Sequence, residues 1–398
     1  MNATTPLATP GVDVLIVGAG PVGATLALLL QGSGRSVALL EARAGAATDA
    51  RTLALSYGSR LTLEEIGVWD DSLNATSIAA IHVSHRGAFG RTLLSCRDAQ
   101  VPALGYVLSY AKLQQALDRR LDASQVAMVR GASVEDIACG EGEMHVTYKL
   151  GSASQTTPTT TPTPIVARLL VLADGGANIG KIPDIQVVEK DYGQSALLGS
   201  VTTDKPHGGI AYERFTPIGP AALLPKENYF SLVWTASPET VQRLLALEDP
   251  AFLAELNQHF GQRAGKFLTI AQRASFPLKL RYAVPRVAAR VAVIGAAAQA
   301  LHPVAGQGLN LGVRDAADLA ALLCRHADED PGGTALLQRF AGLRKADARM
   351  GIEFTDALVR LFSTDNPLLR TGRGVGLALL DIAPMARRTL ARKMIFGA

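Results

Sequence analysis

A glycine-rich turn between an apolar run and a helical pattern constrains the fold of this chain more than any other feature. The run Val12 to Val17 (VDVLIV) leads into Gly18-Ala19-Gly20-Pro21-Val22-Gly23, and a helical pattern follows from Ala24 to Leu30. The turn has the pattern G-x-G-x-x-G. Glycines at these positions permit a tight turn, a close backbone approach to a pyrophosphate, and close packing of the helix on the strand. The segment therefore predicts a strand–turn–helix unit that binds a dinucleotide.

An acidic residue follows the second apolar run, at the position where a dinucleotide-binding unit needs a carboxylate. A second apolar run, Ser36 to Leu40, ends in Glu41, eighteen residues after Gly23. A carboxylate there can accept both hydroxyls of an adenosine ribose and would repel a 2′-phosphate. The motif alone does not separate FAD from NAD.

A second glycine-rich segment lies almost 280 residues further along the chain. His302 to Asp315 reads HPVAGQGLNLGVRD and leads into a helical pattern from Leu309 to Leu323. Its three glycines are Gly306, Gly308 and Gly312. They let the backbone approach a flat ligand, and the free N–H groups of the following helix favour negative charge there. The alternative is an ordinary tight loop between a strand and a helix.

Three apolar runs end in small, glycine-rich turns. They read VLIVGAG near residue 14, LLVLADGG near residue 170 and VAVIGAAA near residue 292. Runs without alternation are typical of strands that are buried on both faces of a parallel sheet, and ligands bind beyond the carboxyl ends of such strands. The sequence therefore predicts a Rossmann-like α/β fold in which the three turns gather.

The region between residues 183 and 287 has a different pattern. Phe230, Leu232 and Trp234 alternate with Ser231 and Val233, and several prolines interrupt the region. This alternation predicts a sheet with one covered face, which forms a second domain inserted into the first.

Composition excludes several function classes. The chain has 398 residues, is 48% hydrophobic and carries a formal net charge of +4, without a basic stripe that would predict nucleic-acid binding. Cys96, Cys139 and Cys324 form no C-x-x-C pair, so neither a disulfide nor a metal site is expected. The N-terminal MNATTPLATP lacks a basic region, so no signal peptide is expected and the predicted location is the cytoplasm.

These motifs together resemble those of the single-component flavin aromatic hydroxylases. The resemblance rests on GAGPVG with Glu41, on Ala173-Asp174-Gly175 after a strand, and on the block from Gly295 to Asp315. Within that family, HPVAGQGLNLGVRD is similar to the motif of the ubiquinone-biosynthesis hydroxylases. Further stretches resemble the branch that acts on 2-polyprenyl-6-methoxyphenol: Ile81 to Ser84 with Arg86-Gly87, Arg214 to Thr216, Gly219-Pro220 with Leu224-Pro225, Ser231 to Trp234, and Leu361-Phe362.

The resemblance covers the chain from about residue 12 to the C-terminus and implies three parts. A discontinuous FAD-binding domain would comprise residues 1–73, 97–182 and 288–330. A β-sheet substrate domain would comprise residues 74–96 and 183–287, and C-terminal helices would comprise residues 331–398.

The family's cofactor contacts carry over to matching positions of this sequence. Gly18, Gly20 and Gly23 would face the FAD pyrophosphate, and Glu41 the adenosine ribose. Arg43 and Arg51 would lie along the adenosine and flavin sides, although both could be ordinary surface charges. Asp174 with Gly175 would orient the ribityl–pyrophosphate region, and Asp174 could also cap an Asx turn. The residues expected along the isoalloxazine are Pro303, Gly306, Gly308, Leu309 and Asn310.

The sequence departs from the family pattern at the third turn. Most members have Gly-Asp-Ala-Ala-His, whereas this chain has Gly295-Ala296-Ala297-Ala298-Gln299. Ala296 lacks the carboxylate that usually accepts a ribityl hydroxyl. A hydrogen bond to a charged group contributes roughly 1.5–3 kcal/mol, so FAD binding would be on the order of ten- to a hundredfold weaker. Glutamine at 299 is similar to the 6-methoxyphenol branch, so we interpret Ala296 as a trait of that branch.

The chemistry implied is electrophilic hydroxylation. NAD(P)H would reduce FAD, O2 would form a C4a-hydroperoxyflavin, and the distal oxygen would pass to an electron-rich phenol carrying a polyprenyl tail. The sequence identifies no catalytic acid or base, and His302 is more typical of a structural hydrogen bonder. Six basic residues among apolar ones between Arg370 and Ala398 predict a helix that contacts a membrane surface, with packing on the domain as the alternative.

Two other functions stay open. One is a hydroxylase of the same family that acts at another ring position or on another aromatic. The other is a flavin-poor scaffold in a complex of ubiquinone-biosynthesis proteins, which the altered 296 position would suit.

Overall fold

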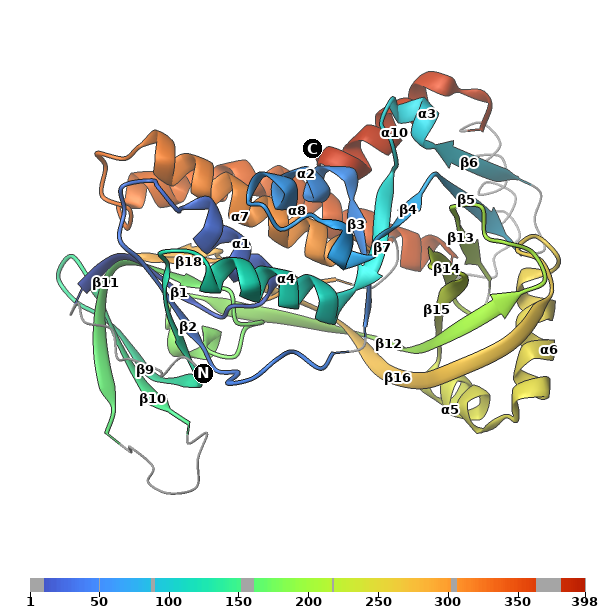
Figure 1. The fold of residues 1–398 in the computed structure, drawn as a ribbon, viewed down its shortest axis with the longest axis horizontal. Helices are drawn as coiled ribbons and strands as arrows, with labels where there is room; N and C mark the ends of the chain where they lie inside the picture. Colours follow the sequence, from blue (N-terminus) through green and yellow to red (C-terminus); the bar gives the residue numbers. More distant parts are fainter. Residues whose placement is uncertain are drawn as a thin grey trace.

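Two large sheets organise the chain, and the first is mainly parallel (Figure 1). The computed structural model describes residues 11–49, 51–86, 90–151, 161–216, 218–301, 306–362 and 381–397. Along the first sheet the strands run in the order β17 (Val287–Ala288), β18 (Val291–Val293), β11 (Thr163–Leu172), β1 (Gly11–Val17), β2 (Val37–Glu41) and β8 (Ala127–Arg130). An antiparallel extension adds β10 (Met144–Leu150) and β9 (Ala132–Cys139).

The three apolar runs predicted as strands are neighbours in this sheet. Strand β11 pairs in parallel with β1 on one side and with β18 on the other. Their carboxyl ends therefore meet at one edge, as the sequence predicts. The prediction of a Rossmann-like α/β architecture is confirmed.

Helices cover one face of the first sheet. They are α1 (Pro21–Leu29), α4 (Tyr110–Asp122), α7 (Gln307–Arg325) and α8 (Thr334–Phe362). Side chains from these helices and from the sheet, such as Ile16, Leu26, Leu319 and Phe340, form one apolar core. A second core on the opposite face lies beneath β9 and β10. Both faces are thus buried, which explains why these strands lack alternation.

The second sheet alternates as predicted. Its strands run in the order β19 (Gln299–Ala300), β16 (Phe267–Val284), β12 (Gln186–Thr203), β15 (Tyr229–Ala236), β14 (Ala221–Lys226), β13 (Ile210–Phe215), β5 (Ala80–His85) and β6 (Arg91–Ser95). Helices α5 (Pro238–Ala246) and α6 (Asp249–Phe260) cover one face and pack on Leu232 and Trp234. The proposed division into domains stays a prediction.

Two long strands connect the two sheets. β12 and β16 are each eighteen residues long and pair antiparallel along their length. One end of this pair contributes Ala283 to the second core of the first sheet, and the other end contributes Leu197 and Ile270 to the core under α5 and α6. In Figure 1 the pair runs from the first sheet to the far end of the second.

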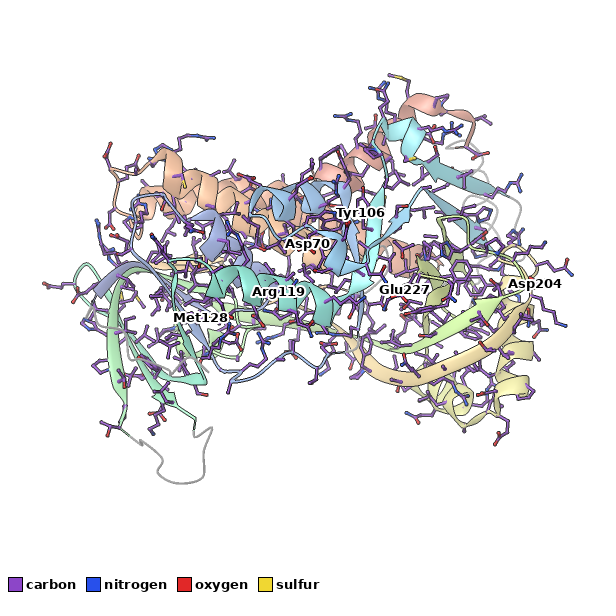
Figure 2. All side chains as sticks on the ribbon, viewed as in Figure 1. Asp70, Tyr106, Arg119, Met128, Asp204 and Glu227 are labelled. Atoms are coloured by element: carbon purple, nitrogen blue, oxygen red, sulfur yellow. The ribbon has the colours of Figure 1, made fainter. Side chains whose placement is uncertain are left out.

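A small third sheet joins the two parts. It contains β3 (Thr52–Ser56), β7 (Gly105–Ser109) and β4 (Thr76–Ile78), and α2 (Tyr57–Glu65) follows β3. At this junction, where Figure 2 labels Glu227, the N–H of Glu227 donates to the hydroxyl of Thr76 over 2.8 Å. Three short helical elements complete the description: η1 (Asp71–Leu73), α3 (Cys96–Ala99) and η2 (Ile179–Lys181). The last described helix, α10 (Pro384–Phe396), packs on α2 and α3.

Candidate active site

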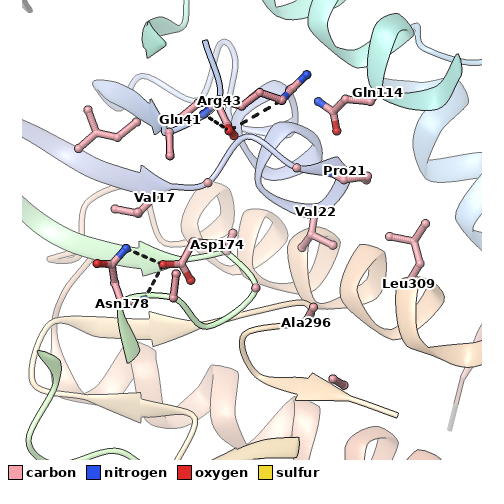
Figure 3. Close-up of a pocket in the computed structure, with 18 of the residues that line it drawn as sticks. Val17, Pro21, Val22, Glu41, Arg43, Gln114, Asp174, Asn178, Ala296 and Leu309 are labelled. Carbon is pink, nitrogen blue, oxygen red and sulfur yellow. Dashed lines mark hydrogen bonds and ion pairs between the residues drawn. The ribbon is translucent and has the colours of Figure 1, made fainter. Parts of the chain in front are cut away.

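A cavity of about 790 Å³ lies at the edge where the carboxyl ends of the parallel strands meet (Figure 3). The turns after β1, β2 and β11 line it, together with Ala296 and the first turn of α7. Most of the predicted cofactor residues share this wall: Gly18, Gly20, Glu41, Arg43, Arg51, Asp174, Gly175, Ala296, Gly308 and Leu309. Residues that are far apart in the sequence thus form one continuous surface.

The three glycines of the first turn have different reasons to be glycine. Gly18 has φ +99°, and a Cβ there would lie 2.7 Å from the Cα of Asp174. A Cβ on Gly23 would lie 1.9 Å from the carbonyl oxygen of Gly18. Gly20 differs, because its Cβ would meet only the hydroxyl of Tyr110, at 4.0 Å. Gly18 and Gly23 therefore permit the close packing of turn, strand and helix, while Gly20 leaves room for a ligand.

The N-terminus of α1 is free to bind an anion. Gly20 is the N-cap residue and no side chain caps the helix among the described residues. Pro21 at the first position has no N–H, and the backbone N–H groups that follow carry the positive end of the helix dipole. A phosphate group placed beside Gly20 would complete this helix end.

Glu41 is held rigidly beside the glycine turn. Its carboxylate accepts the N–H of Ala19 over 2.7 Å and the N–H of Arg43 over 2.8 Å. These bonds fix both oxygens at the end of β2 and leave lone pairs for further donors. The arrangement suits recognition of a pair of ribose hydroxyls.

Gln114 is a site residue that the sequence analysis missed. Its amide N–H₂ group donates to the carbonyl of Ala19 over 2.8 Å and to the carboxylate of Asp118 over 2.9 Å. Asp118 also pairs with Arg43 over 3.2 Å. A glutamine inside a helix carries no local signal of such a role, because only the fold brings α4 against the glycine turn.

Arg51 stands at the cavity wall over an aromatic ring. Its guanidinium lies 5.2 Å from the ring centroid of Tyr110 and pairs with Asp49. Hydrogen bonding to Asp49 raises the pKa of Arg51, so the side chain is charged at every physiological pH. It is more exposed than Arg43 and has charge available for a ligand.

Asp174 forms the Asx turn that the sequence suggests. One carboxylate oxygen accepts the N–H of Gly176 over 2.9 Å, and the other accepts the N–H and the side-chain amide of Asn178. The turn bends the chain so that Asp174 and Gly175 both face the cavity. In Figure 3 Asp174 and Asn178 lie across from Glu41 and Arg43.

The third turn carries an unsatisfied amide. Ala296 is exposed to the cavity, and Gln299 lies on the same wall with only 1% of its surface exposed. In the described part of the chain, neither the oxygen nor the nitrogen of the Gln299 side chain has a hydrogen-bond partner. A buried amide without partners is costly, roughly 1–3 kcal/mol per polar group, so this side chain is placed to hydrogen-bond a ligand in the cavity.

The helix after the second glycine-rich segment begins at the cavity. Gly306, with φ +59°, is the N-cap residue of α7, and Gly308 and Leu309 line the wall. Asn310 instead turns away, because its amide is bonded to Ser56 and Ser59 at buried positions. Three predicted cofactor residues do not line the cavity in the described part of the chain: Gly23, Gly306 and Asn310. Their contacts with a cofactor stay predictions. Pro303 and His302 lie outside the described residues.

A family model described as an FAD binding domain matches residues 11–355, which is most of the chain. The chain belongs to the FAD-binding domain family. The fold resemblance agrees: p-nitrophenol 4-monooxygenase PnpA from Pseudomonas putida has a TM-score of 0.76 at 18% identity, covering 98% of this chain and 99% of that one. PqsL from Pseudomonas aeruginosa has a TM-score of 0.74 at 20% identity, covering 92% of this chain and 100% of that one.

Two relatives show to which branch of this family the chain belongs. The chain is 36% identical over 396 residues to ubiquinone hydroxylase UbiL from Rhodospirillum rubrum, covering 96% of this chain and 89% of the relative. It is 30% identical to 3-demethoxyubiquinol 3-hydroxylase from Escherichia coli, covering 94% of this chain and 96% of the relative. This member of the FAD-binding domain family is therefore an FAD-dependent monooxygenase of the ubiquinone-biosynthesis hydroxylase branch, as the sequence motifs predict.

The residues present fit FAD. The space beside Gly20, the uncapped α1 and the fixed Glu41 carboxylate suit the adenosine diphosphate part of the cofactor. The unpartnered amide of Gln299 and the start of α7 lie where the same cavity continues. FAD is thus a cofactor for which this wall supplies both charge and hydrogen bonds.

Proposed function

We propose that this enzyme hydroxylates the aromatic ring of a polyprenylated methoxyphenol in ubiquinone biosynthesis. FAD, when bound, supplies the activation of O2, and NAD(P)H is the proposed reductant. The names of the relatives support a role in ubiquinone biosynthesis, and the sequence motifs support a methoxyphenol as the substrate. The observation that carries the substrate class is a half-buried apolar surface on the second sheet.

This surface is the face of the second sheet that α5 and α6 do not cover. On β14 and β15 the side chains alternate: Leu223 and Leu232 are fully buried under the helices, whereas Leu224 and Val233 are half-buried. The strand register places Leu198 and Val83 on the same side as Val233. We call this surface the open face; its half-buried apolar residues are Ile81, Val83, Leu198, Ala222, Leu224 and Val233. Two of them, Ile81 and Leu224, pack at its border on a small core that includes Ile395 of α10.

One end of the open face lies beside β3, the strand that contributes Leu53 to the cavity wall. Lys226 lies two residues after Leu224 on the same side of β14, and its ammonium donates to the hydroxyl of Thr52 over 3.3 Å. Thr52 precedes Leu53, which lines the cavity. An aromatic ring between the open face and α7 would therefore lie near the flavin end of the site.

A polyprenyl tail suits such a surface because apolar burial supplies affinity. Each Å² of apolar surface removed from water contributes about 25 cal/mol. A long-chain phenol should then bind far more tightly than a short-chain analogue.

The cofactor contacts are proposals of the same kind. Gly18 and Gly20 with α1 would hold the pyrophosphate, Glu41 the adenosine ribose, and Arg43 and Arg51 the flanks of the cofactor. Asp174 and Gly175 would orient the ribityl chain. The N-terminus of α7, at Gly308 and Leu309, would stabilise negative charge on the reduced flavin.

We also propose that α10 brings the enzyme to a membrane surface. Ile382 and Met385 are 75% and 76% exposed, while Ala391 and Ile395 anchor the helix on the protein. Arg388 and Arg392 lie on the same helix. Apolar tips flanked by basic residues favour an anionic bilayer. In the described part of the chain, none of the helices is long and apolar enough to cross a membrane.

The direct test is product analysis with purified, FAD-loaded enzyme. The enzyme is incubated with NADPH or NADH, O2 and 2-geranyl-6-methoxyphenol, and the products are analysed by mass spectrometry and NMR. We expect a product with one added oxygen on the ring. NADPH oxidation that releases only hydrogen peroxide would contradict the proposal.

A second candidate is hydroxylation at another ring position. The relative named 3-demethoxyubiquinol 3-hydroxylase favours this alternative. The regiochemistry of the product decides between them, as does the intermediate that accumulates in a deletion strain. An accumulating lipid that already carries the expected hydroxyl would exclude our assignment.

A further inference from the structure

The open face contains an acid in an apolar setting. Glu213 lies in the middle of β13 and pairs with Val83 of β5 and Ala222 of β14. Its neighbours two residues away on the same strand are Ala211 and Phe215. In β5, β13, β14 and β15, all within the described residues, Glu213 is the one carboxylic acid.

Strand geometry fixes the direction of the Glu213 side chain. Successive side chains of a strand point to opposite faces. The next residue, Arg214, points toward the helices, because its Nε donates to the carbonyl of His259 in α6 over 2.6 Å. Glu213 therefore points the other way, onto the open face, the side from which Lys226 reaches Thr52 of β3.

The carboxyl group has no partner in this position. Across the described residues it makes no hydrogen bond and no ion pair, although the residue is half-buried. Burial raises the pKa of Glu213 to about 8. The other titratable groups on this side of the neighbouring strands are His85 on β5, Lys226 on β14 and Tyr229 on β15. A half-buried carboxyl in an apolar setting without a partner is unfavourable for the fold, and its presence points to a ligand.

We propose that Glu213 binds the phenolic hydroxyl of the substrate and acts as the base that accepts its proton. This inference rests on the proposed function, which supplies the phenol. An apolar ring would lie on the leucine and valine side chains of the open face, with its hydroxyl directed to the one acid among them. A phenol has one hydrogen-bond donor, its hydroxyl, and the Glu213 carboxylate is an acceptor without a donor partner.

The proton transfer activates the ring for oxygen transfer. The phenol O–H bond breaks, its electron pair stays on the phenolic oxygen, and the proton forms the new O–H bond of the Glu213 carboxyl. The phenolate oxygen donates electron density into the ring and makes it a better nucleophile. The oxygen that bound FAD would activate adds to the ring carbon as its O–O bond breaks. The hydroxylated carbon then loses its hydrogen to water as a proton, the C–H electron pair restores the aromatic ring, and the carboxyl returns its proton to the ring oxygen.

A base with this pKa suits the task. General bases work best when their pKa is near the working pH, and such catalysis typically contributes 10²–10⁴-fold. The same burial that makes the carboxyl unfavourable in the fold thus makes it a stronger base than an exposed glutamate.

The test compares Glu213→Gln, Glu213→Asp and wild type, each loaded with FAD. Single-turnover hydroxylation of 2-geranyl-6-methoxyphenol is followed between pH 6 and 10 after reduction with NADPH. Glutamine keeps the shape and removes the base, whereas aspartate keeps the base. The matched control is Glu239→Gln, an exposed glutamate in the first turn of α5. FAD content and the unfolding midpoint are measured for each protein.

We expect the wild-type rate to rise with pH, with a midpoint near pH 8, and to level off above about pH 9. Glu213→Gln should lower the rate roughly 10²–10⁴-fold and abolish that rise. Glu213→Asp should restore the pH-dependent shape, and Glu239→Gln should match wild type. A Glu213→Gln enzyme with wild-type rate and pH profile would overturn the role of Glu213 and leave the proposed function intact. A wild-type enzyme that consumes NADPH without hydroxylating the phenol would overturn the proposed function, and this inference with it.

Discussion

The backbone N–H of Gly295 donates a 3.0 Å hydrogen bond to the carboxylate of Asp315. Asp315 is fully buried in α7, and it also pairs with Arg286 over 3.0 Å and with Arg344 over 2.7 Å. One carboxylate therefore ties the turn that carries Ala296 to the helix whose first turn borders the cavity.

Replacing this carboxylate should destabilise the whole protein. Asp315→Asn removes the buried carboxylate that pairs with Arg286 and one of three carboxylates around Arg344, which keeps Asp318 and Asp347. Breaking a buried pair typically costs about 3–5 kcal/mol, so the urea midpoint should fall sharply. Asp328→Asn, an exposed site just after α7, is the control and should leave the midpoint unchanged. Equal midpoints for the two variants would mean that the network adds nothing to stability.

Substitutions of two glycines in the same turn should have separable effects. Gly20→Val places a side chain in the proposed pyrophosphate space, where its Cβ meets only Tyr110. The apoprotein should therefore fold normally but purify without flavin. Gly18→Val, at φ +99° and 2.7 Å from Asp174, should instead impair folding. Circular dichroism and visible absorbance distinguish the outcomes, and a yellow Gly20→Val protein would place the pyrophosphate elsewhere.

Gln299→Leu should move stability and cofactor affinity in opposite directions. The apoprotein loses an unpartnered buried amide and should become more stable, by about 1–2 kcal/mol. FAD would lose a hydrogen-bond partner, so its Kd should rise on the order of tenfold. Thermal denaturation of the apoprotein and titration with FAD measure the two effects, with exposed Gln262→Leu as the control. Unchanged FAD affinity would show that this amide has no ribityl or flavin contact.

Ala296→Asp should restore the carboxylate that most of the family has. Ala296 is exposed to the cavity, so the aspartate needs no repacking. A charged hydrogen bond of roughly 1.5–3 kcal/mol would tighten FAD binding on the order of ten- to a hundredfold. Ala296→Asn, which lacks the charge, should gain less. Weaker or equal binding of FAD by the aspartate variant would indicate that this branch has made the contact elsewhere.

His259 should make stability sensitive to acid. Burial, with a smaller contribution from Arg214, lowers the pKa of His259 to about 3, whereas the unfolded chain has a value of about 6.5. The unfolded state thus takes up the proton first, and this contribution to stability is lost as pH falls from 6.5 toward 3. His259→Phe should flatten the decline by up to about 1.4 kcal/mol per pH unit. Urea unfolding at pH 7, 6 and 5 tests this; parallel curves for the two proteins would refute it.

Sequence patterns were sufficient for the parts of the fold that local rules control. The run before Gly18 and its two counterparts near residues 170 and 292 are adjacent parallel strands. Short apolar runs that end in glycine-rich turns are typical of strands buried on both faces. The helix after Gly306 begins within two residues of its predicted start. The alternation around Trp234 correctly indicated a sheet with one covered face.

The site was less predictable wherever tertiary contacts choose between roles. Asn310 has the family position of a cofactor residue, and its side-chain oxygen accepts hydrogen bonds from Ser56 and Ser59, so its contact with a cofactor stays a prediction. Gln114 and Glu213 have no motif of their own. Their surroundings depend on which strand or helix lies opposite, and a single sequence does not contain that information.

The paired strands β12 and β16 fix the distance between the cavity and the open face. One end is built into the core of the first sheet and the other into the core under α5 and α6, so the distance between cavity and open face is set by residue count. A strand advances about 3.4 Å per residue, and its side chains change face at each step. Removing two residues from each strand would bring the parts roughly 7 Å closer without exchanging the faces. Removing one from each strand would turn the apolar side chains away, unless one of the register shifts that the pair already contains absorbed the change.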